Sequence, residues 1–136
     1  MTEPGRLRAG LLDTCVIIDF RKIPDEVLPV SAGVSTVTLA ELSAGVHLAK
    51  DGLERSARIT RLISAEANFE PLPFDSVTAR AYGNLVALIL AIGRNPKPRK
   101  NDLMIAATAV VHGLPLYTRN VDDFKGLESQ LNIVAV

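Results

Sequence analysis

Short apolar runs alternate along this chain with longer segments whose apolar residues recur at helical spacing. The runs over 9–14, 33–35, 116–118 and 132–136 are predicted to be strands. Helices are predicted over 16–21, 38–49 and 53–67, from Asp75 or Ser76 to Gly93, and from Asn101 to Gly113. Strands separated by helices pair in parallel, and the helices cover both faces of the sheet. The sequence therefore predicts an α/β fold of three layers around a central, mainly parallel sheet.

Proline and glycine indicate where these elements end. Residues 69–74 contain two prolines, which restricts a strand there to the edge of a sheet. Residues 93–101 are predicted to form a loop, and 119–130 an irregular segment with a short helix.

The composition limits the contacts that the chain can make. Fifteen basic and fifteen acidic residues cancel, so nucleic acid would have to be bound by a local patch. A single cysteine, Cys15, excludes an internal disulfide and argues against a structural zinc site. Neither a signal peptide nor an apolar run long enough to span a bilayer is present. We expect one domain over 1–136 that is soluble, cytoplasmic and free of membrane contact.

Three acidic residues lie where a single site can gather them. Asp13 follows the first apolar run, at the carboxyl end of a predicted strand, where open α/β sheets bind ligands. Asp102 lies in the first turn of a helix, and Glu41 follows Thr38 with the spacing of a capping box. Each acid also has a structural explanation, because Asp13 can cap a turn and Asp102 suits the helix dipole. Only their joint arrangement indicates a common site.

The loop after the strand 116–118 offers further oxygen ligands on the same side of the sheet. The segment Thr118-Arg119-Asn120-Val121-Asp122-Asp123-Phe124 would add one or two of them. Neighbouring carboxylates repel one another unless a cation lies between them. Oxygen ligands without histidine or cysteine favour Mg²⁺ or Mn²⁺ over zinc.

Basic residues lie immediately before Asp102 and beside the last acidic loop. They are candidates for the local patch that could bind a nucleic-acid backbone: Arg94, Lys97, Arg99, Lys100 and Arg119. An equally simple interpretation is a solvated loop that keeps the surface polar. Cys15 has no basic neighbour or histidine to activate it, and we expect it to contribute only to packing.

Four segments that together span most of the chain form a joint pattern: Leu11-Leu12-Asp13-Thr14, Thr38-Leu39-Ala40-Glu41-Leu42 with Gly45, Asn101 to Ala109, and Thr118-Arg119-Asn120 followed by Asp122-Asp123-Phe124. In these segments the chain resembles the PIN-domain ribonucleases, and among them the VapC-type toxins. Together and in this order the segments are a specific signal, although none is specific alone.

The resemblance implies a PIN-like fold and a metal-dependent endoribonuclease, the toxin of a type II toxin–antitoxin pair. It implies that Asp13, Glu41 and Asp102 are the central acids, while members of the family differ over which residue of the last loop is the fourth. We favour Asp122 as the fourth acid, with Asn120 as a neutral ligand or supporting partner and Thr118 and Asp123 as further supporting residues. The basic residues named above would then contact the RNA backbone. The resemblance also implies a VapB-type antitoxin that reaches the acidic pocket, promoter DNA bound only through the antitoxin, and a homodimer. The alternative is a module that keeps the fold and binds RNA or protein without cleaving it.

Overall fold

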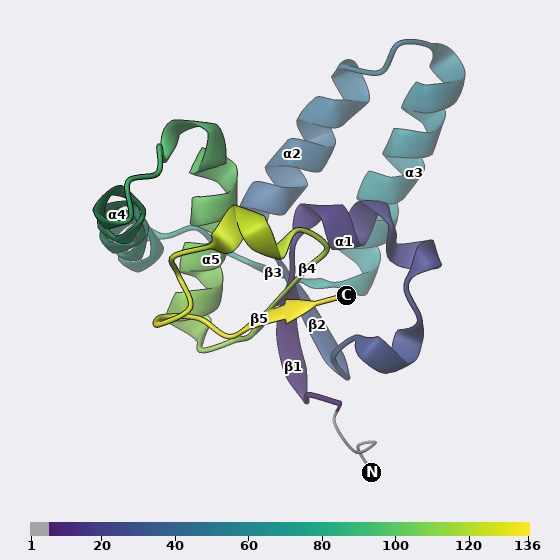
Figure 1. The fold of residues 1–136 in the computed structure, drawn as a ribbon. Coiled ribbons are helices and arrows are strands. Elements are labelled where there is room, and N and C mark those ends of the chain that lie inside the picture. Colours follow the sequence, from purple (N-terminus) through teal and green to yellow (C-terminus); the bar gives the residue numbers. More distant parts are fainter. Residues whose placement is uncertain (1–5) are drawn as a thin grey trace.

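The computed structural model describes residues 6–136 (Figure 1). Its strands are β1 (Ala9–Leu12), β2 (Ser31–Ser35), β3 (Glu70–Leu72), β4 (Leu116–Thr118) and β5 (Ile133–Ala135). Its α-helices are α1 (Thr14–Ile18), α2 (Thr36–His47), α3 (Gly52–Asn68), α4 (Ser76–Ala91) and α5 (Lys100–His112). The short 3₁₀ helices are η1 (Phe20–Lys22), η2 (Asp25–Val27), η3 (Lys97–Arg99) and η4 (Val121–Phe124).

The five strands form one sheet in the order β3-β2-β1-β4-β5, and every pair in it is parallel. The proline-bearing strand β3 lies at the edge, as predicted. The backbone nitrogen of proline has no hydrogen to donate, so a central strand would lack a hydrogen bond at that residue. All carboxyl ends lie along one border of the sheet. The residues that follow β1, β2 and β4 therefore lie near one another.

Both faces of the sheet are buried, because successive residues of a strand point in opposite directions. Leu11 of β1 and Leu116 of β4 pack into the core beneath α4 and α5. Their neighbours Leu12 and Tyr117 pack into a second core beneath α1, α2 and α3. The predicted three layers are confirmed, and the predicted "mainly parallel" sheet is wholly parallel.

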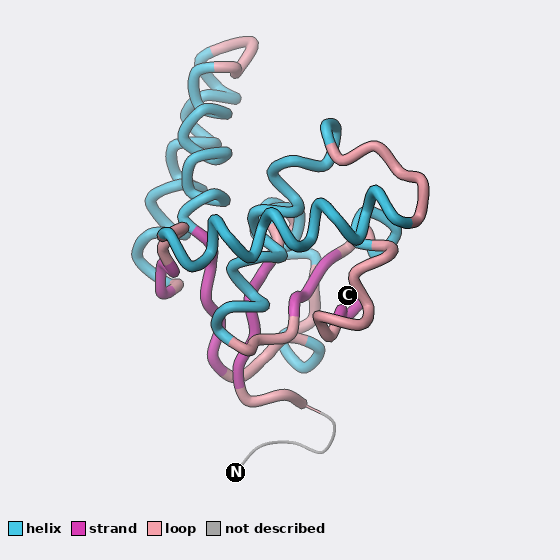
Figure 2. The backbone as a smooth tube through the Cα atoms, turned by 90° about the vertical axis from the view of Figure 1, so that its left-hand side faces the viewer, coloured by secondary structure: helices cyan, strands magenta, loops and turns pink. Residues whose placement is uncertain are grey.

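The helices α2 and α3 form a hairpin that extends beyond the sheet (Figure 1). Figure 2 shows the hairpin from the side, with α4 running across the front of the molecule. Within residues 6–136, the structure contains no helix that is both long and apolar enough to cross a membrane.

Several helix starts differ from the sequence prediction. The helix predicted over 16–21 is α1, which spans Thr14–Ile18, and α3 begins one residue early, at Gly52. The starts of α2 and α5 also differ. Ser35 caps α2, its hydroxyl accepting from the Val37 amide at 3.0 Å, so Thr38 lies inside the helix and is fully buried. Arg99 occupies the N-cap position of α5 without a side-chain cap, which places Asn101 in the first turn. In both cases a 3₁₀ helix or a strand leads directly into the helix, and the helix begins earlier than its apolar pattern.

Candidate active site

Asp13 lies at the carboxyl end of β1 and begins α1. Its Oδ1 accepts from the Thr14 amide at 2.9 Å, and its Oδ2 accepts from the hydroxyl of Thr118 at 2.9 Å and the thiol of Cys15 at 3.2 Å. The residue is 4% exposed. Burial raises the pKa of Asp13, and these three hydrogen bonds oppose the rise. The capping role considered from the sequence is real, but one oxygen performs it while the other contacts β4.

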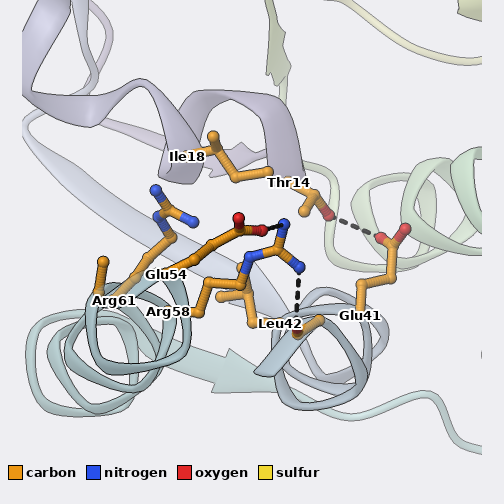
Figure 3. Close-up of a pocket in the computed structure, with 9 residues that line it drawn as sticks. Thr14, Ile18, Glu41, Leu42, Glu54, Arg58 and Arg61 are labelled. Carbon is orange, nitrogen blue, oxygen red and sulfur yellow. Dashed lines mark hydrogen bonds and ion pairs between the residues drawn. The ribbon is translucent and has the colours of Figure 1, made fainter. Parts of the chain in front are cut away.

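Glu41 comes from α2, and both of its carboxylate oxygens are held by neighbouring elements. Oε1 accepts from the Thr14 hydroxyl at 2.7 Å (Figure 3), and Oε2 accepts from Asn101 Nδ2 at 3.3 Å. The Thr14 hydroxyl also contacts that of Thr38 at 3.0 Å. The predicted capping box between Thr38 and Glu41 is therefore wrong, because Ser35 supplies the cap and Glu41 turns toward α1 and α5.

Asp102 lies in the first turn of α5, partly buried. Its pKa is raised from 3.8 to about 7, first by burial and then by the negative charges of Asp13, Asp123 and Glu41, with Arg99 acting in the opposite direction. The three acids singled out from the sequence therefore lie close enough for their charges to act on one another. They come from β1, α2 and α5, which the parallel sheet brings to one border.

The two acids of η4 differ in their surroundings. The Asp122 side chain is 81% exposed and pairs with Arg94 at 3.5 Å. Asp123 pairs with Arg99 at 3.2 Å and contributes to the raised pKa of Asp102, so it is the η4 acid that faces the cluster. A 3₁₀ helix turns by about a third of a circle per residue, so adjacent side chains point in different directions. This geometry does not favour Asp122, the residue that the sequence argument preferred.

Asn120 precedes η4 without a side-chain hydrogen bond to it. Its amide donates to the Thr118 hydroxyl at 3.0 Å, and that hydroxyl donates in turn to Asp13. Thr118 is fully buried. It therefore connects the last loop to the first acid, as expected of a supporting residue.

The donor set suits a hard divalent cation, because it consists of partly buried carboxylates that repel one another. In the described part of the chain, however, no three acidic, histidine or cysteine side chains are arranged as a ready metal-binding group. Hydrogen bonds from Thr14 and Asn101 hold Glu41, and one from Thr118 holds Asp13. Mg²⁺ commonly takes only one or two protein carboxylates and completes its shell with water and phosphate oxygens. The donors present fit that mode of binding.

The basic residues divide into two groups. Arg94 donates to the Asp122 carbonyl at 2.9 Å, Arg99 pairs with Asp123, and Arg119 pairs with Asp19 at 3.5 Å, so these arginines connect loops. Lys97 and Lys100 instead line a hollow of about 410 Å³ together with Glu41, Asn101 and Asp102. Of the predicted RNA contacts, the two lysines are therefore best placed.

Sequence reasoning missed three residues that hold the acids. Thr14 and Asn101 bind Glu41, and Cys15 donates to Asp13. Burial raises the pKa of the Cys15 thiol, which keeps it protonated as a donor and agrees with its dismissal as a nucleophile. Its assignment to packing alone was incomplete. The available signal was that each of the three lies within two residues of a predicted acid.

Comparison with known proteins assigns the family. The PIN domain model matches residues 11–128. Ribonuclease VapC5 of Mycobacterium tuberculosis (strain ATCC 25618 / H37Rv) is 37% identical over 128 residues, which are 92% of this chain and 92% of that protein. The chain belongs to the VapC family of PIN-domain ribonucleases.

Solved structures agree with this VapC assignment. The crystal structure of VapBC-5 from M. tuberculosis, a member of the VapBC family of toxin–antitoxin systems, gives a TM-score of 0.83 at 37% identity, covering 94% of this chain and 98% of that one. VapBC2 from Rickettsia felis, bound to a DNA fragment from their promoter, shares the fold with a TM-score of 0.72 at 23% identity, over 94% and 97% of the two chains. The predicted PIN-like fold and the predicted ribonuclease toxin of a type II toxin–antitoxin system are confirmed.

Proposed function

We propose that this VapC-family chain hydrolyses RNA internally with Mg²⁺ or Mn²⁺, using Asp13, Glu41, Asp102 and an acid of η4. The observation that carries the proposal is the gathering of these carboxylates from β1, α2, α5 and η4, where their charges act on Asp102. Like charges are gathered at a cost in stability, and a bound cation would offset it. For the fourth acid we propose Asp123 in place of Asp122, because Asp123 faces the cluster.

Asp13 and Asp102 would be the main metal ligands, with Asp123 beside them. A divalent cation in this position supplies charge stabilisation for the phosphodiester and lowers the pKa of a bound water. The protein contributes the orientation of the acids. Thr118 and Cys15 hold Asp13 through Oδ2, and Arg99 holds Asp123.

Glu41 would orient the attacking water. Each carboxylate oxygen has two lone pairs, and the bonds from Thr14 and Asn101 use one on each oxygen. A free lone pair remains on each oxygen to accept a hydrogen bond from water. Because α1 and α5 hold the carboxylate from two sides, it has little freedom to turn away, and fixed orientation lowers the barrier to attack.

Lys97 and Lys100 would bind a phosphate of the RNA beside the cleaved bond. Both line the hollow that contains Glu41 and Asp102. Lysine ammonium groups neutralise phosphate charge, and such contacts bind the backbone without selecting a sequence. Because the net charge of the whole chain is +0, RNA has to be bound by a local basic patch of this kind.

The partner would be a VapB-type antitoxin whose segment enters the groove between α1, η1 and α3. That groove has a volume of about 800 Å³, and its lining includes Ile18, Phe20 and Phe69. Promoter DNA would be bound through the antitoxin, because this chain has no net positive charge to attract it. The family further suggests a homodimer and a cytoplasmic location, which sedimentation and cell fractionation can test.

The decisive experiment maps cleavage ends on total cellular RNA incubated with purified protein. We expect cleavage with Mg²⁺ or Mn²⁺, none with EDTA, and none from Asp13→Asn. Exposed Asp25→Asn is the matched control and should cleave as the wild type does. Cleavage that persists in EDTA would contradict the metal-dependent mechanism. Binding of RNA or protein without cleavage by the wild type would establish the non-catalytic alternative.

A further inference from the structure

A second hollow adjoins the acid cluster and shares Glu41 with the hollow that contains Lys97 and Lys100. It lies between α1, α2 and α3, has a volume of about 500 Å³, and includes Thr14 and Glu41 in its wall (Figure 3). The proposed catalytic acid therefore borders both hollows, so an RNA strand cleaved beside Glu41 could have a nucleotide in each.

The wall of the second hollow contains apolar side chains, two arginines and the carboxylates of Glu41 and Glu54. Leu42 and Ile18 provide apolar surface, and Arg58 and Arg61 extend from α3. Arg58 is held in place, because it donates to the Gly45 carbonyl at 2.6 Å and pairs with Glu54. Arg61 has no ion pair among residues 6–136, and its guanidinium lies at the wall toward Ile18 (Figure 3).

We propose that this hollow binds one unpaired nucleotide adjacent to the cleaved phosphate, with its base packed against Arg61 and the Leu42–Ile18 wall. The inference rests on the proposed RNA cleavage. The volume of the hollow falls within the range of small-ligand sites. Unpaired bases are commonly bound by stacking on arginine planes and apolar side chains, which tolerates different base identities. Thr14 and Glu41 in the same wall place that nucleotide next to the reacting bond.

The test uses a short single-stranded RNA that contains a mapped cleavage site. A second substrate lacks the base 5′ to the cut, and a third lacks the base 3′ to it. Each is cleaved by the wild type, by Arg61→Gln and by Arg55→Gln. Arg55 is the matched control, because it is exposed on the same helix and does not line the hollow.

We expect one abasic substrate to lose about 5- to 100-fold in kcat/KM with the wild type, as base stacking predicts. Arg61→Gln should lose about 10-fold on the intact RNA, chiefly through KM, and almost nothing further on that abasic substrate. Arg55→Gln should match the wild type on all three substrates. Such coupling between Arg61 and one base is not produced by a general loss of positive charge.

Two results overturn the inference. One is that the losses from Arg61→Gln and from each missing base simply multiply, so that no base is coupled to Arg61. The other is that Arg61→Gln leaves kcat/KM on the intact RNA unchanged. Weaker antitoxin binding by this variant does not decide the matter, because Arg61 also lines the groove between α1, η1 and α3. If the wild type does not cleave intact RNA with Mg²⁺, the proposed function itself fails, and the abasic comparison is not reached.

Discussion

The charge of Asp102 should destabilise the metal-free protein, and Asp102→Asn should remove that effect. The pKa of Asp102 is raised from 3.8 to about 7. Below pH 3.8 the carboxyl is protonated in both the folded and the unfolded chain. Between 3.8 and about 7 the unfolded chain releases a proton that the folded chain keeps, so rising pH favours unfolding. Above that window the loss of stability is complete.

The magnitude follows from the two pKa values. The difference between 3.8 and about 7 corresponds to an upper limit of roughly 4 kcal/mol. Asp102 is only partly buried, so solvent screening reduces the figure to about 2 kcal/mol. An asparagine amide has nearly the same shape without the charge. We therefore expect Asp102→Asn to be about 2 kcal/mol more stable than the wild type at neutral to alkaline pH and inactive.

Urea unfolding in EDTA at about pH 5 and about pH 8 measures this effect. The wild type should lose more stability than Asp102→Asn between the two pH values. The free energy of unfolding of the variant should still fall with pH, but less steeply, because burial also raises the pKa of Asp13. Exposed Asp25→Asn should retain the wild-type slope. Mg²⁺ added at the higher pH should stabilise the wild type more than the variant.

The reasoning is refuted if Asp102→Asn and the wild type have equal stability at about pH 8 and equal slopes between the two pH values. That outcome would mean that the carboxylate is well solvated and does not interact with the other acids. It would also remove the main support for a cation at this border of the sheet.

Three further predictions concern residues around the acids. Thr14→Val should lower kcat about 10-fold by releasing Glu41, while Thr14→Ser keeps the hydroxyl and the activity; single-turnover cleavage measures both. Asp123→Asn should raise the Mg²⁺ concentration needed for half-maximal cleavage, whereas Asp122→Asn should not; the reverse ranking would restore Asp122 as the fourth acid. Ser35→Ala should lower the free energy of unfolding by about 1 to 2 kcal/mol through loss of the α2 cap, and thermal unfolding without a change in Tm would contradict the assigned helix start.

The sequence by itself determined the layered architecture and the positions of three acids. Apolar periodicity is a local property, so strands that alternate with helices lead to a parallel sheet covered on both faces. Asp13 ends an apolar run and Asp102 begins a helix, and those positions lie on the carboxyl border in such a sheet. The edge position of β3 follows from its prolines in the same way.

Only the tertiary structure decided which side chains contact those acids. Whether Thr14 and Asn101 hold Glu41 depends on how α1 and α5 approach α2, and no local pattern encodes that approach. The choice between Asp122 and Asp123 depends on the direction of each side chain in one 3₁₀ turn and on which arginine lies opposite. Local propensity places acids on elements, but packing between distant elements sets the hydrogen bonds, burial and charge that make them a site.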